Sequence, residues 1–186
     1  AYNDFDFPND KIEKVEALRY LYLANTNTNK NKELIIKTNN LNKLLVLCDI
    51  DLESTYKQLK LLINAINTIK FRVEITIKPH PLCSINKNDF PDLDFEVTNM
   101  PLGEIMPSYH TVFTSNPTAA VLDAYLLNKN VLIMHDCSTF NMSPLRGYKD
   151  VKFIKSSDDL VKSLTHFMKK NSYNSNNLDY FYLDNN

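Results

Sequence analysis

Apolar residues between positions 43 and 170 follow two alternating patterns. Short apolar runs, such as KLLVLCDI at residues 43–50 and NVLIMHD at residues 130–136, are typical of strands buried on both faces of a sheet. Between such runs the apolar residues recur every three or four positions, as in LESTYKQLKLLINAINTIK at residues 52–70, and this spacing predicts amphipathic helices. We expect strands at residues 43–50, 71–78, 94–100, 111–115, 130–136 and 151–156, and helices at residues 52–70, 101–109, 117–129 and 157–170.

This alternation of short strands and helices predicts the α/β class. Strands joined by helices lie parallel, so we expect a Rossmann-like, doubly wound, mainly parallel sheet of about six strands with helices on both faces. We divide the chain into an N-terminal helix and linker extension at residues 1–42, a Rossmann-like domain at residues 43–170 and a C-terminal tail at residues 171–186. In the extension, we expect Asp10 to cap a helix over residues 11–25.

Composition narrows the classes of function. The 186 residues carry a net charge of −1 with basic residues scattered along the chain, which argues against a nucleic-acid-binding protein. No apolar run reaches the length of a membrane span, and no signal peptide is visible. The three cysteines lack metal-ligand spacing and are expected to be buried, reduced thiols of a cytoplasmic protein. Since the chain opens on Ala1, we expect it to be cut from a longer protein.

Several well-known motifs are missing from the sequence. There is no GxGxxG after the first strand, which disfavours a dinucleotide cofactor, and no Walker loop of an ATPase. No GxSxG elbow, HExxH or paired Cys/His metal pattern is found either. Asp49 and Asp51, after the first strand, could bind magnesium in a phosphatase or belong to a response-regulator-like acidic cluster. Strand-end carboxylates also commonly serve as turn or cap residues, so these readings stay open.

The segment TSNPTAAVLDAY at residues 114–125 predicts an anion site. Ligands of open α/β sheets bind beyond the carboxyl ends of the strands, where this segment lies. Pro117 suits the first position of a helix, which makes Asn116 the expected cap. The free N–H groups of such a helix start, together with the hydroxyls of Thr114, Ser115 and Thr118, would bind an anion. The alternative is that Ser115 and Asn116 simply cap a helix.

The segment ITIKPHPLC at residues 75–83 places a histidine between two prolines at a strand end. Pro79 and Pro81 restrict the backbone around His80 and hold the imidazole above the edge of the sheet. His80 could then donate to a phosphate oxygen and, when protonated, stabilise a phosphate leaving group, with Lys78 adding positive charge. The alternative is a proline-rich turn with a solvent-exposed histidine.

Both segments together resemble a known enzyme family. KPHP after one strand, followed by TSNPTAAVLDAYLLNKNVLIMHD, is similar to the carboxyl-terminal, donor-binding domain of GT-B glycosyltransferases. The nearest group is that of bacterial polysaccharide sialyltransferases, CDP-glycerol glycerophosphotransferases and related surface-carbohydrate transferases. The similarity covers residues 43–168, and the segment FNMSPLRG at residues 140–147 also resembles part of such transferases. Asn116 and Pro117 stand where relatives often have paired Ser or Thr, which leaves open how many hydroxyls would hold the phosphate.

The resemblance implies one half of a GT-B enzyme that needs no bound metal or other cofactor. Such an enzyme transfers a sugar, for example a nonulosonic acid, from a CMP-, CDP- or UDP-activated donor in the synthesis of surface polysaccharide or another glycan. His80 would be the catalytic residue that stabilises the leaving phosphate. The donor-binding residues would be Lys78, Pro81, Gly103, Glu104, Thr114, Ser115, Asn116, Thr118, Asp136, Asn141, Ser143 and Arg146.

The resemblance also implies partners. The acceptor would be a glycan or a lipid-linked sugar, and an N-terminal GT-B domain would be missing from this chain, because only about forty residues precede the regular pattern. We expect the fragment alone to be inactive, and the missing part to be able to associate with a membrane surface. The alternatives are a non-catalytic nucleotide or sugar-phosphate binding module and another Rossmann-like enzyme, such as a nucleotide-sugar epimerase.

Overall fold

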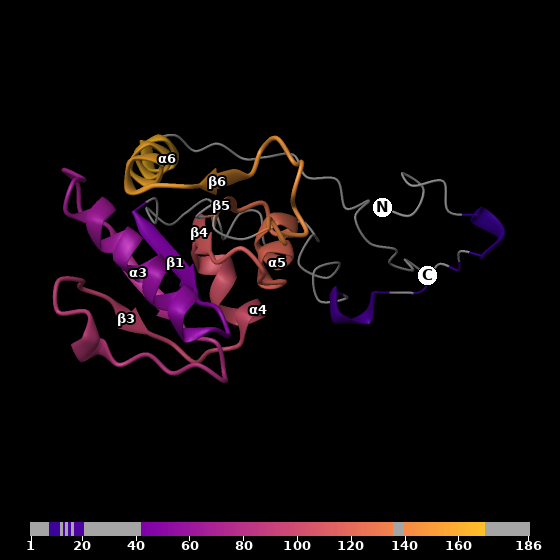
Figure 1. Cartoon of the computed structure of the whole chain (residues 1–186), viewed down its shortest axis with the longest axis horizontal. Coiled ribbons are helices and arrows are strands. Elements are labelled where there is room, and N and C mark those ends of the chain that lie inside the picture. Colours follow the sequence, from indigo (N-terminus) through magenta and orange to yellow (C-terminus); the bar gives the residue numbers. More distant parts are fainter. Residues whose placement is uncertain are drawn as a thin grey trace.

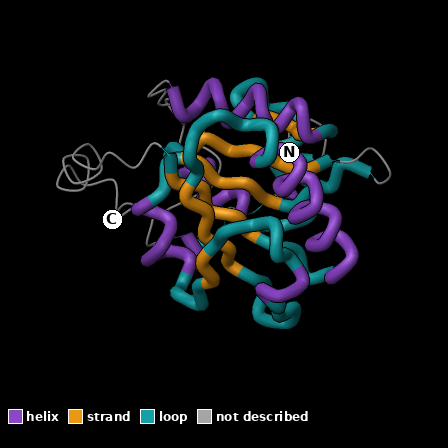
Figure 2. Tube along the Cα trace, turned by 90° about the vertical axis from the view of Figure 1, so that its left-hand side faces the viewer, coloured by secondary structure: helices purple, strands orange, loops and turns teal. Residues whose placement is uncertain are grey.

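The computed structural model contains one six-stranded sheet in which every strand pair is parallel. It describes residues 8–11, 13, 15, 17–20, 42–135 and 140–169. The strands are β1 (Lys43–Leu47), β2 (Glu74–Lys78), β3 (Glu96–Val97), β4 (Thr111–Thr114), β5 (Asn130–Met134) and β6 (Lys152–Ile154). They lie in the order β3-β2-β1-β4-β5-β6 (Figures 1 and 2). The predicted α/β, Rossmann-like class is confirmed, and the order is that of the classic dinucleotide-binding sheet.

The helices cover both faces of this sheet. They are α3 (Leu52–Ile66), α4 (Leu102–Ile105), α5 (Ala120–Leu126) and α6 (Ser157–Lys169), with 3-10 turns η2 (Asn9–Lys11), η3 (Leu18–Tyr20), η4 (Lys87–Asp89) and η5 (Met106–Ser108). Figure 1 shows α3 and α6 on one side of the strands and α4 and α5 on the other. Within the described residues, no helix is both long enough and apolar enough to cross a bilayer.

Alternate residues of the central strands supply two separate cores. Leu44 and Val46 of β1 point to the face of α3 and α6, whereas Leu45 and Leu47 point to the face of α4 and α5. This arrangement explains why the strand sequences are apolar throughout, since a parallel strand covered on both faces has no solvent side. Tyr20 of the N-terminal segment is buried in the second core.

Several boundaries differ from those predicted. The helix expected over residues 11–25 is absent from the described part of this segment, where only η2 and η3 form; the remainder lies outside the described residues. Asp10 lies within η2 and caps no helix. The third strand is reduced to two residues, since the loop before it contributes Phe90, Leu93 and Phe95 to the first core. The last helix is preceded by Ser156, whose hydroxyl accepts the N–H of Asp159, at 3.2 Å.

The helix predicted from Pro117 begins three residues later, at Ala120. Asn116 does not cap it: the N-cap position is Ala119, and the carboxamide oxygen of Asn116 accepts no hydrogen bond within the described residues, while its Nδ2 donates to the backbone oxygen of Phe140, at 2.8 Å. Thr118 turns the chain locally, with its hydroxyl accepting the N–H of Ala120 at 3.4 Å. The prediction that Asn116 caps this helix is therefore wrong, and the helix is seven residues long.

The chain changes direction of winding between β1 and β4, the two neighbouring strands in the middle of the sheet. The connection after β1 passes through α3 on one face, and the connection after β4 passes through α5 on the other. Beneath the resulting gap lies Gln58 of α3, which is fully buried. Its Nε2 donates to the backbone oxygens of Leu47 in β1 and Phe113 in β4, each at 3.3 Å. Gln58 thus fixes the carboxyl ends of both strands to one helix.

We predict that Gln58→Leu lowers the free energy of unfolding by about 1–2 kcal/mol, because two buried carbonyl oxygens each lose a hydrogen bond that contributes about 1 kcal/mol. Urea denaturation followed by circular dichroism measures the change. Lys60→Leu, an exposed position on the same helix, is the matched control and should change stability by less than about 0.5 kcal/mol. Equal stabilities of Gln58→Leu and the wild type would show that these two bonds stabilise nothing.

Candidate functional site

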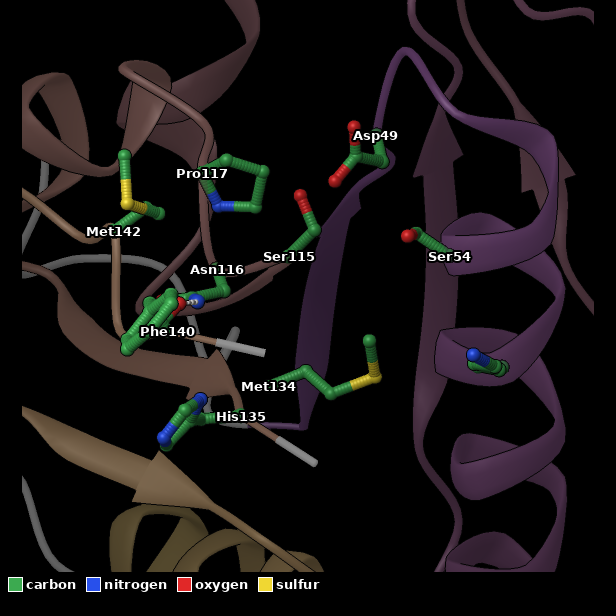
Figure 3. A pocket seen from close by; sticks show the side chains of 10 residues that line it. Asp49, Ser54, Ser115, Asn116, Pro117, Met134, His135, Phe140 and Met142 are labelled. Atoms are coloured by element: carbon green, nitrogen blue, oxygen red, sulfur yellow. Dashed lines mark hydrogen bonds between the residues drawn. The ribbon is translucent and has the colours of Figure 1, made fainter. Parts of the chain in front are cut away.

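A pocket of about 340 Å³ opens at the carboxyl ends of β1, β4 and β5, at the point where the strand order reverses. Six residues give it polar walls: Asp49, Ser54, Lys57, Ser115, Asn116 and His135. Four residues give it apolar walls: Pro117, Met134, Phe140 and Met142. In Figure 3 the side chains of Asp49 and Ser115 point toward one another from the ends of β1 and β4, and Ser54 faces them from α3. Open α/β sheets bind their ligands at such a switch point.

Asp49 is held rigidly at the end of β1 and is only 5% exposed. The hydroxyl of Thr55 accepts the N–H of Asp49 at 3.2 Å and donates to its carbonyl oxygen at 3.3 Å. One carboxylate oxygen, Oδ1, accepts the N–H of Asp51 at 3.1 Å, which makes a tight turn. The other oxygen, Oδ2, accepts no hydrogen bond from the described part of the chain. The strand end therefore presents one carboxylate oxygen to the pocket.

Asp51 caps α3. Its Oδ2 accepts the N–H of Ser54 at 2.7 Å, and hydrogen bonding to the backbone N–H and then to the side chain of Ser54 lowers the pKa of Asp51. Both aspartates thus have the turn and cap roles considered above for strand-end carboxylates. Among the residues that the structure describes, no group of three or more His, Cys, Asp or Glu side chains could hold a metal ion.

Ser115 and Asn116 bring buried polar atoms to the opposite wall. Ser115 is 1% exposed, and Asn116 is also buried. Neither the hydroxyl oxygen of Ser115 nor the carboxamide oxygen of Asn116 has a hydrogen-bond partner within the described residues. Buried polar atoms are nearly always hydrogen-bonded in folded proteins. Both atoms belong to residues that line the pocket, which indicates a place for a polar ligand.

The segment after β5 forms the apolar lip of the pocket. Asn116 holds it through the bond to Phe140, whose side chain is 88% exposed, and Met142 is exposed beside it. Asn141, Ser143 and Arg146 do not line the pocket. They bond within their own loop instead: Asn141 accepts from the N–H of Ser143 at 3.1 Å and from Arg146 Nη1 at 3.4 Å. Asp136 lies outside the described residues.

His80 is at the same edge of the sheet but outside the pocket. β1 lies between β2 and β4, so about 10 Å separates the end of the His80 strand from the end of the Ser115 strand. The imidazole is half-buried, and its Nδ1 accepts the N–H of Leu82 at 3.2 Å. This bond leaves Nε2 as the nitrogen that can donate. The His80 carbonyl accepts the N–H of Cys83, a buried residue that anchors the turn.

The remaining predicted site residues also lie outside the pocket. Lys78 is half-buried at the end of β2 and Pro81 is exposed in the turn that follows. Gly103 and Glu104 belong to α4, with Glu104 exposed. Thr114 is fully buried beneath the pocket wall, and Thr118 is engaged in the turn before α5. Of the predicted donor-binding residues, the structure brings only Ser115 and Asn116 into the pocket.

Eight lining residues are not among the predicted site residues: Asp49, Ser54, Lys57, Pro117, Met134, His135, Phe140 and Met142. Asp49 and His135 could be found from their positions directly after apolar strands. Phe140 and Met142 carry a weaker signal, because two large apolar residues in a polar loop often mark a binding surface. Lys57 and Ser54 carry none, since they read as ordinary polar positions on the exposed side of an amphipathic helix.

No protein-family model and no curated protein sequence matches this chain.

We predict that Asp51 stabilises the fold only above the pH at which it becomes protonated. The pKa of Asp51 is lowered in the folded state, so the unfolded chain binds its proton first, at about pH 3.9, and the stabilisation disappears as pH falls further. Asp51→Ala should therefore unfold at lower urea concentration than the wild type at pH 7, with the difference shrinking below about pH 4. A difference that stays constant down to pH 2 would contradict this role.

Proposed function

We propose that this domain binds the nucleotide-linked sugar donor of a glycosyltransferase, with the ligand seated in the switch-point pocket. The observation that supports this most directly is the pair of buried, unpartnered oxygens of Ser115 and Asn116, two residues that line a pocket at the sheet's carboxyl edge, with Ser115 facing Asp49 across it. The volume of about 340 Å³ is within the range of small-molecule sites. The resemblance of KPHP and TSNP to GT-B donor domains adds the chemical class of the ligand.

Exposed apolar side chains near the pocket support the proposal that a second domain packs against this edge of the sheet. Six large apolar side chains are exposed in the loops that follow the strands or at the first position of α3: Ile50, Leu52, Leu82, Met100, Phe140 and Met142. Exposed apolar surface that gathers around a polar pocket marks interaction sites. We assign this apolar surface as the contact for the N-terminal domain of a GT-B transferase, which would close the pocket and bring the glycan or lipid-linked acceptor. The present chain alone would then bind donor without turnover.

His80 has the geometry of a donor to a phosphate at the rim of the pocket. The bond from the Leu82 N–H fixes Nδ1 as an acceptor, so the proton of the neutral ring is on Nε2. Lys78 lies two residues before it on the same strand end. A phosphate bound here would receive one hydrogen bond from the imidazole and electrostatic stabilisation from the lysine.

A second candidate is a non-catalytic nucleotide or sugar-phosphate binding module. One observation favours it: His80, the only residue proposed as catalytic, does not line the pocket. Both candidates would bind the nucleotide or sugar phosphate, but only a transferase domain would take part in forming product. The chain combined with the N-terminal domain of a GT-B transferase, and given CMP-, CDP- or UDP-linked sugars and a glycan acceptor, should form product if the domain belongs to such a transferase.

We predict that a bulkier apolar side chain at Ser115 weakens nucleotide binding. Ser115→Val replaces an inward hydroxyl by a bulkier apolar group, and affinity for CMP, CDP or UDP should fall at least about tenfold by isothermal titration. Ser108→Val, an exposed position on η5, is the matched control and should bind as the wild type does. Ser115→Ala removes the hydroxyl without adding volume, and thermal unfolding of each variant shows whether a loss of affinity arises from misfolding. Equal affinities in all four proteins would place the nucleotide elsewhere.

His80→Ala is expected to weaken binding of CMP and CDP about tenfold, the contribution of one hydrogen bond to a charged phosphate, with no change in thermal unfolding. The control is His166→Ala, an exposed histidine of α6. Unchanged affinity for every nucleotide tested would remove His80 from the site.

A further inference from the structure

Resting on the proposed function, we infer that the switch-point pocket binds the hydroxyl-bearing ring of the donor, its ribose or its sugar, and that the phosphate binds outside the pocket. At the ends of β1 and β4 the pocket walls offer hydrogen-bond acceptors where a phosphate site would need donors, and the lysine that lines the pocket, Lys57, forms an ion pair with Glu53, at 2.9 Å. Three features carry this assignment: the start of α3, the start of α5 and the composition of the pocket walls.

At the start of α3, several backbone donors are already used within the turn. Rossmann domains that bind pyrophosphate there use a glycine-rich turn whose N–H groups point at the ligand. In this chain the N–H groups of Asp49, Asp51 and Ser54 already donate to Thr55 Oγ1, Asp49 Oδ1 and Asp51 Oδ2. Two carboxylates, Asp49 and Asp51, stand where the anion would bind, and a phosphate would be repelled by both.

The start of α5 offers no better site. Because the helix begins at Ala120, the N–H of Ala120 donates to the Thr118 hydroxyl. The N–H groups of Val121 and Leu122 donate to the backbone oxygens of Thr118 and Ala119, at 3.4 and 3.1 Å. These groups are satisfied within the turn.

The walls of the pocket fit a polyol. Asp49 Oδ2 and Asn116 Oδ1 are acceptors, and the Ser115 hydroxyl can donate or accept. Neighbouring hydroxyls on a saturated ring donate to such a set. Met134 and Met142 line the same space and can contact the apolar C–H face of the ring. A ring seated here leaves its phosphate toward the solvent rim, at the edge where Lys78 and His80 follow β2.

Asp49→Asn tests the assignment, because the asparagine keeps an oxygen for the Asp51 N–H and replaces the second acceptor by a donor. Asp51→Asn is the matched control, since Asp51 does not line the pocket and asparagine is an equally good helix cap. The probes for isothermal titration are CMP against 2′,3′-dideoxy-CMP, UDP-glucose against UDP, and pyrophosphate alone.

We expect Asp49→Asn to weaken binding of CMP or UDP-glucose about tenfold and to leave pyrophosphate binding unchanged or tighter. The ribose is the bound ring if dideoxy-CMP loses as much affinity as the mutation causes and the two losses do not add. The sugar is the bound ring if the mutation erases the difference between UDP-glucose and UDP.

Two other outcomes would contradict the inference, and they differ in what they say about the proposed function. If the wild type binds CMP and Asp49→Asn tightens binding, the phosphate lies near Asp49; if the mutation leaves the affinity unchanged, no ligand hydroxyl contacts Asp49. In both cases the inference fails and the proposed function survives. If the wild type binds none of these nucleotides at millimolar concentration, the proposed function fails and the inference fails with it.

Discussion

The reversal of winding between β1 and β4 is the constraint on which the rest of the structure depends. Neighbouring strands whose connections leave toward opposite faces cannot have both exits covered by one loop, so a gap opens above their carboxyl ends. Gln58 closes the gap from below by donating to Leu47 and Phe113, one carbonyl on each strand. The space above stays open, and the first residues after each strand become its walls.

Residues that line such a gap are buried, but some of their polar atoms have no hydrogen-bond partner in the part of the chain that the structure describes. Asp49 has its backbone fixed by Thr55 and one carboxylate oxygen fixed by Asp51, yet its other oxygen faces the pocket. Ser115 and the carboxamide oxygen of Asn116 are buried and lack partners within the described residues. Leaving a buried polar atom unpaired costs on the order of 1–3 kcal/mol, and sequences retain such a cost mainly where a ligand removes it.

The sequence was sufficient to predict the α/β class, because apolar runs and helical spacing are local properties of the chain. It could not reveal that β1 lies between β2 and β4, and that order separates His80 from Ser115. The start of α5 was also beyond it. Pro117 and Asn116 carry strong helix-start signals, but the helix begins only at Ala120, and the Asn116 carboxamide is oriented by a long-range bond to Phe140. The turn and cap roles of Asp49 and Asp51 were among the interpretations that the sequence allowed, because both residues follow a strand end.

The shortage of glycine explains why the edge of this sheet differs from a dinucleotide site. Glycine lets backbone N–H groups approach a phosphate closely. The chain has only Gly103 and Gly147, and neither lies in the turn directly after β1 or β4. The turn after β1 is instead stabilised by side chains: the carboxylates of Asp49 and Asp51 each accept a hydrogen bond from a backbone N–H, which is then not available to a ligand. The turn after β2 is stiffened by Pro79 and Pro81, which have no donor to offer. A ligand at this edge therefore meets side chains before backbone, so its recognition depends on carboxylate, carboxamide, hydroxyl and imidazole groups.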